Sequence, residues 1–152
     1  MGVRINNLPA ASSVNVSTDY FIFMQEGVTK RATPSQFSSG SAPTQSFGIT
    51  VDGAGSVVTA GSKGFVTIPY SCTITNWYLA ADQSGDVVID MKRGGTSIIG
   101  TGNHPTLSPA QFGNAAVSGW TSVAITAGDI LEFVVTGTPA TLTRVNLVIK
   151  AQ

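Results

Sequence analysis

The sequence predicts an all-β protein: an antiparallel, jelly-roll-like β-sandwich with a short N-terminal arm and hairpin. The stretch from Gly119 to Lys150 contains three segments rich in β-branched residues, separated by turn-forming residues. In the last of these segments, Val145, Leu147 and Ile149 alternate with polar residues, as in a strand with one buried face. Turn signals also recur every eight to twelve residues or so along the chain, a spacing typical of sandwiches and barrels.

The N-terminal part of the sequence predicts an arm followed by a hairpin. Residues 1–18 are mostly small and polar, whereas 19–25 and 28–32 are two β-forming segments joined by a turn at Glu26-Gly27. Thr33-Pro34 is a signal for one turn of helix after the hairpin. An isolated hairpin is marginally stable in water, and its first strand carries apolar residues on both faces. It must therefore dock on its own C-terminal domain, on copies of itself or on another protein, and the flexible tether that follows disfavours the first of these.

A Ser/Gly/Pro-rich segment at residues 38–46 predicts a flexible linker. The chain is thus expected to have three parts: an attachment and oligomerisation module at 1–37, the linker at 38–46, and the β-sandwich at 47–152. The side chains predicted to anchor the module or to pack the oligomer are Leu8, Tyr20, Phe21, Phe23 and Phe37.

Within the sandwich region, short apolar segments bounded by Gly-rich turns predict the individual strands. The expected strands cover residues 48–51, 56–59, 64–69, 72–79, 86–92, 123–125, 130–136 and 141–150. The region 94–118 lacks a clear pattern and contains Pro105 and Pro109. Here the sequence predicts a single helical turn over Leu107 to Phe112, after Ser108.

Composition argues against several classes of function. Only 11% of the residues are charged, and the 8 Lys and Arg residues balance the 8 Asp and Glu residues. No basic field is therefore expected to hold nucleic acid or an anionic membrane. The N-terminus lacks the apolar run of an export signal, so we expect the protein to stay in the cytoplasm where it is made. A surface with so few charges is typical of a protein that is partly covered by copies of itself or by partner proteins.

The residues capable of chemistry do not form a recognisable site. Cys72 is the only cysteine, so neither an internal disulfide nor a cysteine cluster is possible, and we expect it to be buried. His104 lies in a Gly/Asn/Pro segment and is predicted to be a turn residue instead of a metal ligand. Asp82, Asp86 and Asp90 faintly resemble a calcium loop, but turn and strand-end roles fit them better. The sequence predicts neither an enzyme nor a cofactor.

Three aromatic residues are candidates for stacking on a sugar. Trp77 and Tyr78 are neighbours in one predicted strand, so one of them must face away from the core. Trp120 leads directly into a predicted strand, which favours a place in the core over stacking on a ligand.

Two parts of the chain resemble bacteriophage structural proteins. The segment LPAASSVNVSTDYFIFMQEGVTKRATPSQF, Leu8 to Phe37, resembles an N-terminal segment of tail-fibre and head-fibre proteins of tailed phages. The segments ITVDGAGSVVTAGSKGFVTIPYSCTITNWYLAADQSGDVVIDM, GWTSVAITAGDILEFVV and TRVNLVIK are similar to a β-sandwich domain of phage virions. The resemblance implies a homotrimer that is located in the virion, assembled in the host cytoplasm, and fixed to a major capsid or tail protein.

The resemblance leaves two functions to distinguish. A chain of 152 residues lacks the long repetitive shaft of a typical tail fibre, which favours a short surface fibre or a capsid decoration protein. The alternative is a tail module that recognises carbohydrate on the host surface.

Overall fold

The structure is a computed structural model that describes residues 21–25, 28–32 and 43–152. The chain divides into two compact units, Met1–Pro43 and Thr44–Gln152. In the first unit, β1 (Phe21–Gln25) and β2 (Val28–Ala32) pair antiparallel, which confirms the predicted hairpin. The predicted arm at residues 1–18, the helical turn predicted at Thr33-Pro34 and residues 38–42 of the linker lie outside the described residues.

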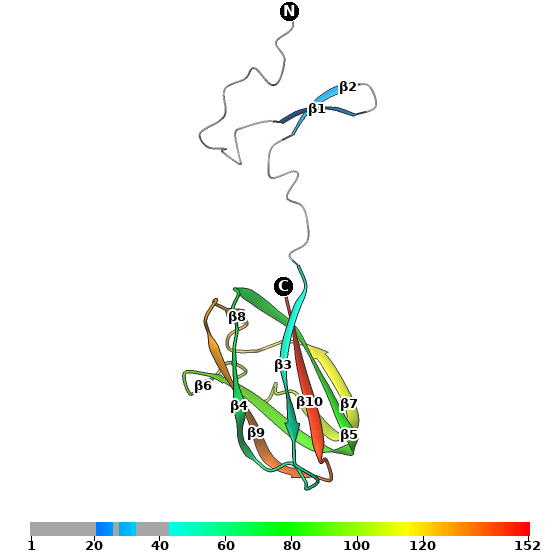
Figure 1. Cartoon of the computed structure of the whole chain (residues 1–152), viewed down its shortest axis with the longest axis vertical. Helices are drawn as coiled ribbons and strands as arrows, with labels where there is room; N and C mark the ends of the chain where they lie inside the picture. The colour runs from blue at the N-terminus through cyan, green and yellow to red at the C-terminus, as the bar shows by residue number, and fades with distance from the viewer. Residues whose placement is uncertain (1–20, 26–27, 33–42) are drawn as a thin grey trace, which may run out of the picture. The chain divides into compact units, whose positions relative to one another are not determined.

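The second unit is built from antiparallel strands alone (Figure 1). The main path of hydrogen-bonded neighbours is β3-β10-β5-β9-β4, and β6, β7 and β8 each pair with β5. The sheet nearly closes into a barrel-like shape, and the predicted antiparallel β-sandwich is confirmed. The strands are β3 (Gln45–Asp52), β4 (Gly61–Thr67), β5 (Cys72–Arg93), β6 (Thr96–Ser97), β7 (Thr106–Ala116), β8 (Ala124–Ile125), β9 (Ile130–Ala140) and β10 (Arg144–Ala151).

Strand β5 belongs to both layers of the sandwich. Its first half pairs with β10 and β7, and its second half pairs with β9 and, from Gly85 to Val88, with the start of β7. The register shifts between Ala80 and Gly85, where the strand passes from one layer to the other. A Cβ atom at Gly85 would lie 2.3 Å from the carbonyl oxygen of Ala140, so only glycine allows the β9–β10 loop to approach here. The turn signal before Asp86 therefore marks a bulge within one strand of 22 residues, not the gap between two strands.

The predicted helical turn over residues 107–112 is wrong, because this segment lies in β7. Its ladder with β5 is irregular between Leu107 and Ala110, around Pro109. A bulge accommodates proline, which lacks an N–H group. After a second irregularity, between Ala110 and Phe112, regular pairing runs from Phe112 to Ala116. Pairing with the long edge of β5 has overridden the weak local preference for a turn.

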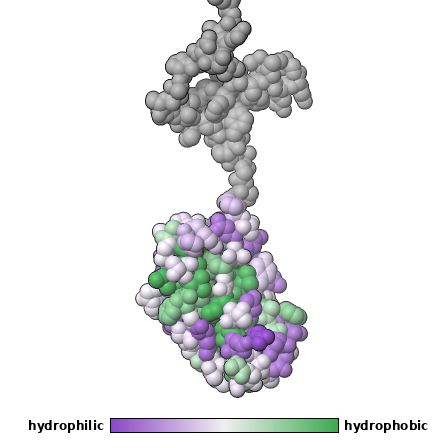
Figure 2. Space-filling model, viewed as in Figure 1, coloured by the Kyte–Doolittle hydropathy of each residue, from purple (hydrophilic) through white to green (hydrophobic). Residues whose placement is uncertain are grey.

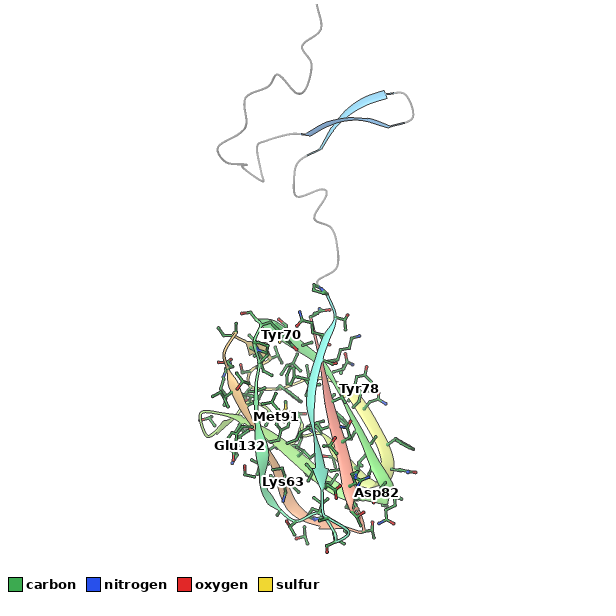
Figure 3. The ribbon with its side chains drawn as sticks, in the orientation of Figure 1. Lys63, Tyr70, Tyr78, Asp82, Met91 and Glu132 are labelled. Carbon is green, nitrogen blue, oxygen red and sulfur yellow. The ribbon has the colours of Figure 1, made fainter. Side chains whose placement is uncertain are left out.

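The core lies between the two layers, and its largest side chains come from the inward faces of β5, β9 and β10. Met91, Leu131, Phe133, Leu147 and Ile149 are each 0% exposed, and Figure 3 shows Met91 inside the sandwich. The alternating burial of β10 is the pattern that its sequence predicts. All the core side chains that the structure describes belong to the second unit, which therefore has a hydrophobic core of its own.

The two end strands of the path, β3 and β4, lie next to each other and form a seam. Within the described part of the chain, no backbone ladder joins them. Phe47, Ile49 and Val66 pack on the core from these strands but are only partly buried. Figure 2 shows apolar residues gathering on the face that carries β3 and β4. We call Phe47, Ile49 and Val66 the β3–β4 seam.

Candidate binding surfaces

The structure tests only some of the predicted site residues. Phe21 and Phe23 lie in β1, but their side chains are not among the described parts. Leu8, Tyr20 and Phe37 lie outside the described residues altogether. Their role in anchoring or oligomer packing remains a prediction.

Of the three aromatic stacking candidates, only Tyr78 is exposed, whereas the other two are buried or half-buried. Trp77 points into the core and is 9% exposed, whereas its neighbour Tyr78 points outward and is 43% exposed. Trp120 is partly buried against the core and donates its Nε1–H to the carbonyl oxygen of Asn103 at 3.1 Å. The predicted alternation of Trp77 and Tyr78 is confirmed, and Trp120 is mainly a packing residue.

Tyr78 lies on an uncharged outer face of the first layer. Its partners across the sheet are Val148 on β10 and Asn114 on β7, and Gly48 on β3 continues the row. The row beside it ends at Phe112, which is 69% exposed. We call these two rows the neutral face: Gly48, Val148, Tyr78 and Asn114 in one, and Thr50, Asn146, Ala80 and Phe112 in the other.

Phe112 is the residue of this face that the sequence did not reveal. The helical turn predicted over 107–112 hid the strand alternation that points Phe112 outward. Its position beside Tyr78 depends on the register between β5 and β7, which are far apart along the chain. No local pattern specifies that register.

A second surface is the end of the sandwich opposite the point where the linker enters. Because Gln45 pairs with Ala151 and Asp52 with Arg144, the first strand begins and the last strand ends at the same end of the layer. Each strand has 8 residues, so the opposite end is roughly 25 Å away. We call the segments 53–60, 82–86 and 137–143 at that opposite end the loop end.

Hydrogen bonds and an ion pair cross-link the loop end. Asp52 accepts hydrogen bonds from the backbone N–H of Ala54 at 2.8 Å and from Nη2 of Arg144 at 2.7 Å. Asp82 accepts from the backbone N–H of Thr143 at 3.2 Å and from its hydroxyl group. The hydrogen bond from Ala54 is the largest cause that lowers the pKa of Asp52, and the hydrogen bond from Arg144 comes second. The hydrogen bond from the Thr143 hydroxyl lowers the pKa of Asp82.

The loop end also holds two non-glycine residues in the left-handed backbone region. Ala54 has φ of 53° and Thr141 has φ of 68°, a conformation that costs about 1–2 kcal/mol in such residues. Thr141 is held by the bond from its hydroxyl to the carbonyl oxygen of Ser84 at 2.7 Å. Hollows of about 100, 230 and 300 Å³ lie among these loops. They are small or at the lower limit for a small-molecule pocket.

Acid is expected to destabilise the loop end through Asp52 and Asp82. A carboxylate with a lowered pKa in the folded state stabilises the fold above its unfolded-state pKa, near 3.9, and loses that contribution as pH falls through the folded-state pKa. The contribution of the two groups should therefore be constant from pH 7 to about 5 and disappear at more acidic pH. Thermal unfolding of the D52N/D82N variant and of wild type should differ at pH 7 and converge in acid.

The matched control is Asp86→Asn, because among the described residues the Asp86 carboxylate has neither a hydrogen bond nor an ion pair. This control should unfold like the wild type at pH 7. A difference between D52N/D82N and wild type that persists unchanged at pH 2 would contradict the assigned role of these carboxylates.

The carboxylates considered as a calcium loop lie in different environments. Asp82 accepts its hydrogen bonds from Thr143 within the loop end. Asp90 is 5% exposed and accepts a hydrogen bond from the Ser97 hydroxyl at 2.6 Å. His104 is more than a turn residue, since its Nε2 lies 3.4 Å from the same oxygen of Asp90. Within residues 21–25, 28–32 and 43–152, no three His, Cys, Asp or Glu side chains are grouped so that they could hold a metal ion.

The Ser97–Asp90–His104 cluster does not have the order of a hydrolase triad. In such a triad the imidazole lies between the hydroxyl and the carboxylate. Here Ser97 donates directly to Asp90, and its oxygen also accepts the backbone N–H groups of Ile99 and Gly100, each at 3.2 Å. The cluster therefore ties the β6 segment to β5. Cys72 is buried as predicted, and burial raises the pKa of its thiol.

Comparison with known proteins adds no relative to these observations. No family model matches the sequence, and no curated protein is significantly similar to it. The described residues contain no helix that is long and apolar enough to cross a membrane.

Proposed function

We propose that this chain is a non-enzymatic structural component of a bacteriophage virion, either a short surface fibre or a capsid decoration protein. The observation that carries the proposal is the division of the chain at Pro43 and Thr44 into two compact units, the second with its own core. The first unit contains the segment that resembles phage fibre proteins and would attach to the particle. The second unit would be displayed on the surface.

The geometry of the second unit suits such a display. The linker joins it at Thr44, next to the first residue of β3, and the chain ends at the same end of the layer. The cross-linked loop end is the part of the unit farthest along the strands from this junction. A domain tethered in this way would direct its loop end outward from the particle.

Exposed apolar side chains favour self-association of the proposed fibre, and the resemblance to phage fibre proteins implies that three copies assemble. Phe65 on β4 is 68% exposed, and Ile130 on β9 is 53% exposed. The two strands are neighbours, and Ile130 is diagonal to Phe65, whose direct partner is Glu132. Together with the β3–β4 seam, this region offers an apolar surface that copies of the chain would cover.

Deletion of residues 1–37 tests the proposal. The truncated chain should keep a cooperative thermal transition and the circular dichroism of a β protein, because it has a hydrophobic core of its own. Light scattering should give about three times the 15.6 kDa chain mass for the full chain. Co-sedimentation with particles that lack the protein should be lost on truncation. Truncated chains that bind particles as well as the full chain would refute the attachment role.

A second candidate function, recognition of carbohydrate at the host surface, is favoured by one observation. Two aromatic side chains, Tyr78 and Phe112, are exposed on the neutral face. The two candidates are compatible, because attachment would use the first unit and recognition the second.

A further inference from the structure

We propose that the neutral face is a binding site for an uncharged oligosaccharide. In this site Tyr78 and Phe112 would stack on the apolar faces of sugar rings, and the amides of Asn114 and of Asn76, which lies in the row next to the neutral face, would bond to sugar hydroxyls. The inference rests on the second candidate function and gives it a site and a ligand class. It does not depend on attachment to a particle.

The two aromatic rings are placed to act together. Tyr78 is paired with Asn114, and Phe112 is paired with Ala80, so the two aromatic residues are diagonal neighbours on adjacent strands. Diagonal positions on one face are roughly 7–8 Å apart, within reach of aromatic side chains. Tyr78 is 43% exposed and Phe112 is 69% exposed. Figure 3 shows Tyr78 at the side of the sandwich that β5 and β7 form.

The neighbours of these rings leave their faces open. Ala80, the direct partner of Phe112, has a side chain too small to cover its ring. The direct partners of Tyr78 are Val148 and Asn114, and Tyr78 is still 43% exposed between them. The first half of β5 is also paired on both sides, with β10 and with β7, so the backbone that carries Tyr78 is fixed before a ligand arrives.

Amides beside the rings can supply directional contacts. Asn146 is already engaged, since its Nδ2 donates to the hydroxyl of Thr50 at 2.9 Å. Asn76 and Asn114 have no side-chain hydrogen bond to any residue that the structure describes. A free amide offers two donors and an acceptor, which matches sugar hydroxyls.

The charge of the face selects the class of ligand. Neither row of the neutral face contains an acidic or basic residue. The nearest basic residue in the register is Lys150, which lies opposite Asn76 and is diagonal to Tyr78, and the Asp52–Arg144 ion pair follows at the loop end. A site for an acidic glycan would be expected to present a cluster of Arg or Lys beside the rings, and a single Lys at the edge does not form such a cluster. An uncharged saccharide is the complementary ligand.

The area of the face argues against a second copy of the chain as its occupant. Four strands spaced about 4.8 Å apart and two rows of side chains span roughly 250 Å². A stable protein interface buries about 800 Å² on each partner. The neutral face is therefore about a third of the necessary size, but it can cover one or two sugar rings.

An array of neutral and acidic oligosaccharides, followed by calorimetric titration of the best binder, tests the inference. The protein is the 44–152 fragment, which has its own core, and the full chain is measured in parallel. We expect binding of a neutral oligosaccharide, and we expect Y78A and F112A each to weaken it about tenfold. Y78F keeps the ring and should retain most of the affinity. V57A is the matched control, because Val57 is 42% exposed, close to the value for Tyr78, but lies at the loop end, outside the neutral face.

Several results would overturn the inference. One is that neither the 44–152 fragment nor the full chain binds a neutral glycan, and another is that they bind acidic glycans alone. A third is that binding survives the Y78A and F112A substitutions in variants that unfold like the wild type. A fall in the mass of the 44–152 fragment on F112A, seen by light scattering, would instead assign the face to a second copy. Particle attachment by the full-length Y78A/F112A variant should be unchanged, so failure of glycan binding can be told apart from failure of attachment.

Discussion

Phe133→Ala in the 44–152 fragment is expected to lower the free energy of unfolding by about 3–5 kcal/mol. Phe133 is 0% exposed and lies in β9, opposite Met91 of β5 and Gly64 of β4. Removing its ring would leave a cavity in the middle of the sandwich. Because β9 is paired on both sides, the backbone cannot move inward to fill that cavity.

The matched control is Phe65→Ala, which removes the same atoms from a side chain that is 68% exposed. Its effect in the same fragment should be within about 0.5 kcal/mol of zero. Urea unfolding followed by fluorescence of Trp77 and Trp120 measures both variants. Equal losses for the two substitutions would mean that β9 does not lie in the core as the structure has it.

The strands that the sequence predicted best are those in which burial alternates along the chain. In β10, Val145, Leu147 and Ile149 are all buried, as their spacing indicates. Such a pattern depends only on local residues and on the presence of a core on one side. The fold class followed from several segments of this kind separated by turns.

Features that depend on distant parts of the chain could not be predicted in the same way. Gly85 looks like a turn residue, but glycine is required there by the close approach of Ala140, which is far away in the sequence. Phe112 becomes a neighbour of Tyr78 only through the register of β7 on β5. The sequence indicated that either Trp77 or Tyr78 faces outward, and burial in the folded layer decides which of them does.

Gly48→Ala is the second substitution for which we expect a large effect, a loss of about 1–3 kcal/mol in the free energy of unfolding. A Cβ atom added at Gly48 would lie 2.0 Å from the carbonyl oxygen of Leu147. That oxygen belongs to the backbone of β10, the central neighbour of β3, and it cannot turn aside as a side chain would. Alanine restricts the unfolded chain more than glycine does, which offsets less than 1 kcal/mol of the loss.

Ser46→Ala is the control for this substitution, because Ser46 is exposed and lies two residues away on the same face of β3. It should change the stability by no more than about 0.5 kcal/mol. Among the described residues, β3 has a backbone partner only on its β10 side, and no ladder joins it to β4. Instead of losing stability, the G48A variant could therefore relieve the clash by moving β3 away from β10. Hydrogen exchange separates the two outcomes. If G48A unfolds like wild type while the β3 amides exchange faster, β3 is a movable edge and the seam can open; if stability falls, β3 is fixed on β10.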